Sequence, residues 1–86
     1  MNTLFLLMAE FNGRAAVPLE EVASKYLGTT DKITLSRKAR SGQLPFPAFR
    51  AEQSQKAPWL VNINDLAAYL DKERDKANND WQQAHA

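Results

Sequence analysis

The 86-residue chain can form one small domain, and its 44% hydrophobic residues can supply a core, which excludes wholesale disorder. It has no cysteine, which excludes disulfide bonds and thiolate metal sites. The net charge of +1 hides a basic centre, because six basic residues and one acidic residue lie between Lys32 and Lys56. Residues 1–31 and 57–86 each carry an excess of two negative charges. Such a localised positive field suits a polyanion better than a small neutral ligand.

The first predicted element is a helix that begins at a cap, Asn2 or Thr3, and runs to about Phe11. The residues that share one face of it are Leu4, Leu7 and Met8. The segment is apolar almost all round, which predicts that it is buried, either in the protein's own core or against a second copy.

The apolar run at residues 4–9 is far shorter than the ~20 residues that a membrane-spanning helix needs. It also lacks the basic start of a secretory signal peptide. We therefore expect a soluble, cytoplasmic protein with no membrane partner.

A second helix is predicted after the turn signal Asn12-Gly13 and a short extended run at residues 15–17. Pro18 suits its first position and Gly28 its end. Its apolar side is predicted to contain Val22, Ala23 and either Tyr26 or Leu27. Only Gly28-Thr29-Thr30 separates it from the next helix, and two short helices joined in this way predict a helix-turn-helix.

The third predicted helix, the basic one, is marked at both ends. Thr29 or Thr30 can cap its first amides, and Asp31 suits the positive end of the helix dipole. Gly42 can take the left-handed conformation that ends a helix, and two prolines soon after it prevent the helix from resuming.

Within this helix, Leu35 and Ala39 lie four residues apart and are predicted to face the core, with Ile33 near their edge. The polar side chains that point elsewhere are Thr34, Arg37, Lys38 and Ser41. Arginine and lysine can bind phosphates and guanine edges, and hydroxyl groups can bind either, which is what a helix in a DNA major groove needs. The alternative is a solvated basic face with no ligand.

Two extended segments, residues 48–52 and 59–63, are predicted as the strands of a hairpin. The polar segment at residues 53–58 would be its tip, and the lysine, serine and glutamine in it suit phosphate oxygens. An ordinary surface loop is the alternative. A helix-turn-helix followed by a hairpin predicts a winged helix, so the expected fold is α+β, mainly α, with a two-stranded wing and a C-terminal helix.

The last helix is predicted to begin at a cap, Asn64 or Asn62, and to have an apolar side of Leu66, Tyr69 and Leu70. Residues 71–86 are a charged extension of it, which is either a frayed, solvated tail or a partner-facing stripe that includes Trp81. We expect residues 1–86 to form one domain.

Residues for catalysis or metal binding are scarce. The only histidine is His85, and the three glycines each lie at a turn or a helix end, so the sequence favours neither a metal site nor a phosphate-binding loop. Glu20 and Glu21 are adjacent and point to different helix faces, which disfavours an acid/base pair. We expect no enzyme activity, no cofactor and no small-molecule substrate.

Several blocks of this sequence together resemble the pyocin activator PrtN-like proteins of bacteria and their prophages. These blocks are MNTLFLLMAEFNGRA, VPLEEVA, RKARSGQLPFP, SQKA and DLAAYLD. The segment from Leu35 to Pro45 is also similar to the helix and turn of phage excisionases and of AlpA- or MerR-like winged helices. The resemblance implies a DNA-binding transcriptional activator that switches on phage-tail-like bacteriocin genes.

The resemblance also implies roles for single residues. Leu35, Ala39 and Leu44 would be core, whereas Arg37, Lys38 and Arg40 would meet DNA, and the wing contact would come from residues 54–56. The full set of DNA-binding candidates is Thr30, Lys32, Thr34, Arg37, Lys38, Arg40, Ser41, Arg50, Ser54, Gln55 and Lys56.

Two alternatives to the activator remain open at this point. An excisionase-like factor that bends attachment-site DNA would use the same fold, and a protein–protein adaptor would use the first and last helices. A lone winged helix reads few base pairs, so the expected partners are double-stranded DNA and a second copy, as a homodimer or a cooperative oligomer on DNA.

Overall fold

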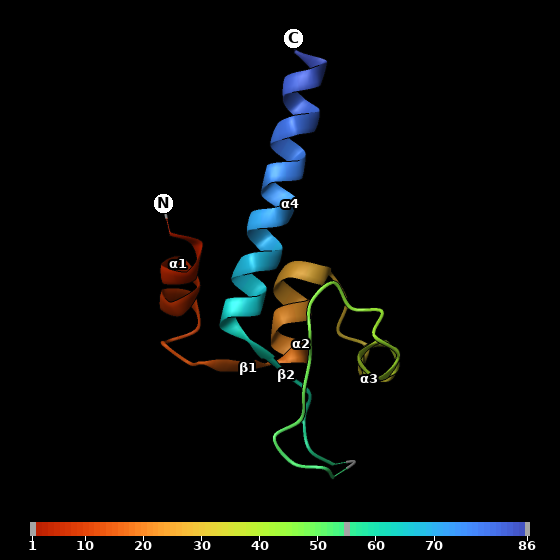
Figure 1. Ribbon diagram of the computed structural model, residues 1–86. Coiled ribbons are helices and arrows are strands. Elements are labelled where there is room, and N and C mark those ends of the chain that lie inside the picture. The colour runs from red at the N-terminus through yellow and green to blue at the C-terminus, as the bar shows by residue number, and fades with distance from the viewer. Residues whose placement is uncertain (1, 55, 86) are drawn as a thin grey trace.

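The computed structural model describes residues 2–54 and 56–85 and has an α+β fold that is mainly helical (Figure 1). The elements in chain order are α1 (Thr3–Glu10), β1 (Ala16–Pro18), α2 (Leu19–Val22), the π-helical segment η1 (Ala23–Leu27), α3 (Lys32–Ser41), β2 (Leu60–Asn62) and α4 (Ile63–Ala84). Figure 1 shows α1 beside α4, α3 on the other side of α2, and the segment before β2 extending away from the helices.

One hydrophobic core joins all the helices. Phe11, Val22 and Leu66 are almost completely buried at its centre, and α3 contributes Leu35. Ala39 and Leu44 pack against this core from its edge, which confirms the predicted inward face of the basic helix. Phe46 is also buried and meets the ring of Tyr69 edge-on, with the ring centroids 5.4 Å apart.

The small sheet differs from the predicted hairpin. Strand β2 pairs antiparallel with β1, and Val17 lies opposite Val61. The predicted strand at residues 48–52 contributes one bridge, in which Phe49 and Leu60 exchange two backbone hydrogen bonds of 2.9 and 2.7 Å. The prediction was wrong about the partner because the short run before Pro18 has the buried side chain, Val17, that pairing with Val61 requires.

Helix α1 is capped by Asn2, whose side-chain oxygen accepts from the Phe5 amide, as predicted. Only one of its faces is buried, with Leu7 at the centre and Leu4 at the edge. Phe5, Leu6 and Met8 are 68%, 49% and 44% exposed, so the prediction that Met8 joins Leu7 in the protein's own core was wrong, and burial against a second copy stays a prediction.

The second helix begins one residue later than predicted, because Pro18 is still the last residue of β1. The amide of Leu19, the first helical residue, donates to the Trp59 carbonyl. The helix widens after Val22 into the π-helical turn, in which the Gly28 amide donates to the Ala23 carbonyl at 2.8 Å. Gly28 then ends it in the left-handed conformation, with φ of 73°.

Helix α4 runs from Ile63 to Ala84 and is capped by Asn62, one of the two predicted caps. The C-terminal segment is therefore helical rather than frayed, although every described residue from Asp71 onward is exposed. We call Asp71–Ala84 the α4 overhang; in Figure 1 it projects away from α3 and β2. Across residues 2–54 and 56–85, no helix is both long and apolar enough to span a membrane.

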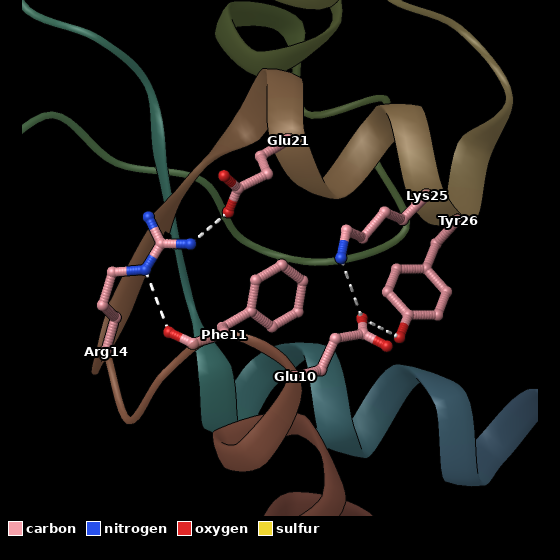
Figure 2. Close-up of polar contacts among 6 residues, drawn as sticks. All are labelled: Glu10, Phe11, Arg14, Glu21, Lys25 and Tyr26. Atoms are coloured by element: carbon pink, nitrogen blue, oxygen red, sulfur yellow. Dashed lines mark hydrogen bonds and ion pairs between the residues drawn. The ribbon is translucent and has the colours of Figure 1, made fainter.

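Polar contacts join the end of α1 to the second helix (Figure 2). Tyr26 donates its hydroxyl hydrogen to Glu10 at 2.6 Å, and the Lys25 ammonium lies 3.9 Å from the same carboxylate. Arg14 donates to the Phe11 carbonyl at 3.0 Å and pairs with Glu21. These contacts surround the Phe11 ring and hold the end of α1 against α2 and η1.

The Tyr26 contact makes stability sensitive to alkaline pH. Burial, and then the hydrogen bond and charge of Glu10, raise the pKa of Tyr26 from 10.0 to about 12. Because the unfolded chain ionises first, the stabilisation is present below pH 10 and is lost as the pH rises towards 12. We expect Tyr26→Phe to be less stable than wild type near neutral pH, and the difference in urea midpoint to shrink across this range. A difference that stays constant with pH would contradict the assignment.

Candidate functional site

The start of α3 is built by its capping residue. Asp31, rather than the predicted Thr29 or Thr30, caps the helix by accepting hydrogen bonds from the Ile33 amide at 3.2 Å and the Thr34 hydroxyl at 2.5 Å. The hydrogen bond from Thr34, followed by those from the backbone, holds the pKa of the Asp31 carboxyl below its usual value. Thr29 has a supporting position, since its hydroxyl accepts from the Asp31 amide at 3.4 Å.

The end of α3 matches the sequence prediction. Gly42 takes the left-handed conformation with φ of 72°, and its amide donates to the Lys38 carbonyl. The Ser41 hydroxyl donates to the same carbonyl at 3.4 Å. The helix is therefore fixed at both ends, although Leu35 is its only buried residue.

The outward side of α3 forms an open, shallow surface that is basic and partly apolar. We call it the α3 face, and its lining residues are Lys32, Ile33, Ser36, Arg37, Arg40 and Ser41. Ile33 was predicted near the core but is 81% exposed, because it lies across the helix from Leu35 and Ala39. Ser36 was not among the predicted site residues, although its position one turn after Lys32 places it on the same side of the helix.

Two of the predicted site residues within helix α3 lie outside this face. Thr34 and Lys38 are half-buried and occupy the opposite flank of the helix from Lys32 and Ser36. The Thr34 hydroxyl is already used at the cap. Thr30 is exposed, in the turn before the helix.

Residues 50–54 and 56–59 form a loop beside α3. The Arg50 guanidinium carbon stacks over the Trp59 ring, 4.4 Å from its centroid, and one of its nitrogens donates to the Ser54 carbonyl at 3.4 Å. The Ser54 hydroxyl accepts from the Lys56 amide at 3.2 Å, which closes the turn. Arg50 and Ser54 therefore shape the loop, while the Lys56 side chain is left exposed.

A groove of about 260 Å³ separates this loop from α3 and from the start of α2. Lys32 and Ser36 line it from α3, and Arg50, Lys56 and Trp59 line it from the loop. The Arg50 Nε and Trp59 Nε1 donors are buried and have no hydrogen-bond partner among the described residues. Three basic side chains line the groove, which makes it suitable for an anionic, oxygen-rich ligand.

One carboxylate lines the groove. The Glu20 carboxylate lies at the groove, 3.6 Å from the Lys32 ammonium. The side chains of both are well exposed, so the pair is weak and Lys32 can exchange Glu20 for another anion.

The structure thus brings together Lys32, Arg37, Arg40 and Ser41 on the α3 face, and places Arg50 and Lys56 across the groove. Thr34 and Lys38 are on another flank, and Ser54 supports the loop. Gln55 lies outside the described residues. The described part of the chain contains no group of three or more metal-ligating side chains.

The chain matches the family model described as pyocin activator protein PrtN over residues 3–77. It belongs to this family. The matched region includes all of α3, the loop and about two thirds of α4, whereas the last two turns of α4 lie beyond it. No curated protein and no solved structure gives a significant match. The family description indicates a regulatory activator of pyocin genes.

The Asp31 cap gives a test of how α3 is held. Asp31→Ala removes the acceptor for the Ile33 amide and the Thr34 hydroxyl, so we expect a lower urea midpoint near neutral pH. Asp31→Asn keeps a capping oxygen but cannot ionise, and we expect it to lose less.

The pH dependence follows from the lowered pKa of Asp31. The advantage of wild type over Asp31→Asn should be full above the usual carboxyl pKa of 3.8 and should vanish as the pH falls through the lower, folded value. Asp31→Ala with wild-type stability would show that the cap does not hold the helix.

Proposed function

We propose that this protein is a sequence-specific double-stranded DNA-binding activator of pyocin or prophage genes, acting in the cytoplasm on nucleoid DNA. The observation that most supports the proposal is that the basic α3 face continues into a groove whose other side is the loop that carries Lys56. Membership of the PrtN family supports the regulatory part of the proposal.

The second helix, the short turn and α3 would act as a helix-turn-helix, with α3 as the helix that enters the major groove. An α-helix fits the width of that groove. Arg37 and Arg40 lie on its exposed side, where they can reach phosphates or guanine edges, and Ser36 and Ser41 can bind either.

The loop would act as a short wing, and we propose that the whole chain forms one winged helix-turn-helix domain. β1, β2 and the Phe49 bridge form the base of this wing. A DNA phosphate beside α3 would meet Lys32 from the helix and Lys56 from the loop, with the Arg50–Trp59 stack fixing the distance between them.

Salt dependence of duplex binding separates this proposal from a protein–protein adaptor with an incidental basic face. Each phosphate contact lowers log K by about 0.9 for a tenfold rise in salt. We expect Lys56→Ala to weaken all duplexes alike and to reduce this slope by about one contact.

Arg37→Ala should also weaken binding, and it should relax base preference. The matched control is Lys76→Ala, which removes the same charge from the α4 overhang and should leave both affinity and slope unchanged. Binding isotherms of fluorescent duplexes, measured over a salt series, provide the comparison. If Arg37→Ala and Lys56→Ala both bind like the control, the proposed DNA surface is wrong.

Ile33 gives a prediction about base reading. A large apolar side chain that is 81% exposed on the α3 face can contact the 5-methyl group of thymine. For the tightest duplex selected from a random-sequence pool, we expect replacing thymine with deoxyuridine to weaken wild-type binding by about three- to tenfold at one position. Ile33→Ala should bind the two duplexes equally. Equal sensitivity of wild type and variant would exclude this contact while leaving phosphate binding intact.

A further inference from the structure

The outer face of α1 is an exposed apolar surface. Phe5, Leu6 and Met8 are 68%, 49% and 44% exposed, and Ala9 beside them is exposed too. The only charged residue of the helix is Glu10, which is held at its end by Tyr26 and Lys25. A helix that faces water normally carries polar residues on its outer side, and this one does not.

The α4 overhang carries a second exposed apolar surface. Leu66, Leu70, Ala77 and Trp81 lie along one line of the helix, because their spacings of four, seven and four residues bring them back to the same side. The first two pack into the core, and the last two extend the same stripe beyond it. Trp81 is 61% exposed and stacks on the His85 ring, with 4.2 Å between the centroids.

The overhang is also long for a helix without support. From Asp71 to Ala84 it spans roughly 20 Å, at 1.5 Å per residue. Most helical stability in proteins comes from the packing of an apolar face, whereas every residue of the overhang is exposed. Packing of its apolar stripe against another surface would supply this stabilisation.

We propose that a second copy of this chain covers both surfaces, so that the protein forms a two-fold homodimer. In this dimer, the apolar stripe of each overhang packs against the outer face of α1 in the other copy. In a two-fold dimer the same contact is made twice, once in each direction. The outer face of α1 in one copy would therefore meet the overhang of the other copy, and the reverse. The overhang is longer than the roughly 12 Å of α1, so it can cover that helix along its whole length.

The exposed area fits a dimer of ordinary size. Phe5 and Trp81, counted in both copies, together expose roughly 400–650 Å² of aromatic surface. Leu6, Met8 and the polar residues around them extend this towards the roughly 1,000 Å² that a specific interface needs. Aromatic side chains are also the usual centres of binding energy in such interfaces.

Charge favours a second copy over an acidic or a basic partner. The outer face of α1 is uncharged, and the charged run of the overhang, residues 71–80, contains three basic and four acidic residues that largely alternate. Two such surfaces can approach without net repulsion. The α3 face, in contrast, carries an excess of positive charge and would repel its own copy.

The test is the oligomeric state of the full chain without DNA, measured by sedimentation equilibrium over a concentration series. We expect wild type to dimerise, and Phe5→Glu and Trp81→Glu each to raise the dimer dissociation constant by at least about tenfold. Both side chains are exposed in a single copy, so circular dichroism should show folded variants.

The matched control is Ile33→Glu, which places the same charge at an even more exposed apolar residue on the α3 face and should leave the dimer intact. A wild-type protein that stays monomeric, or a dimer that survives either Phe5→Glu or Trp81→Glu, would overturn the proposal. Dissociation by Ile33→Glu would place the interface on α3 and would also overturn it. Because no DNA is present, the result is independent of the proposed DNA binding.

Discussion

The arrangement of this protein depends on the pairing of one short strand. Leu60, Val61 and Asn62 pair with Ala16–Pro18 on one side, and Leu60 also bonds to Phe49. Three residues thus connect the segment after α1, the base of the loop and the start of α4. The adjacent Trp59 carbonyl accepts from the first amide of the second helix, so the same stretch also fixes where the helix-turn-helix begins.

Local signals predicted most of the helical fold. The Asn2 and Asn62 caps, the stops at Gly28 and Gly42, and the inward stripe of Leu35 and Ala39 all depend on residues close in sequence. Strand pairing depends on contacts between distant segments, and the sequence pattern predicted residues 48–52 as the partner of residues 59–63. In the structure Val17 provides a buried partner, while residues 48–52 make a single bridge.

The candidate site was predictable in composition but less so in geometry. The excess of basic residues between Lys32 and Lys56 indicated which part of the chain lines the α3 face and the groove. Charge alone does not tell which of these side chains is free to bind a ligand. Arg50 is held by Trp59 and Ser54, and Thr34 is used at the cap, so both have structural contacts that composition could not reveal. Ile33 was predicted near the edge of the inward face of Leu35 and Ala39, whereas its angular position on the helix leaves it 81% exposed.

The π-helical turn at Ala23–Leu27 has a consequence for the orientation of the basic helix. A π turn contains one more residue than the α-helical path it replaces, which is how single-residue insertions are accommodated within a helix. Each residue rotates a helix by about 100°. The extra residue therefore sets the rotational phase at which the chain leaves through Gly28, and loss of one residue from this turn would change the direction from which Lys32 and the residues after it approach a ligand.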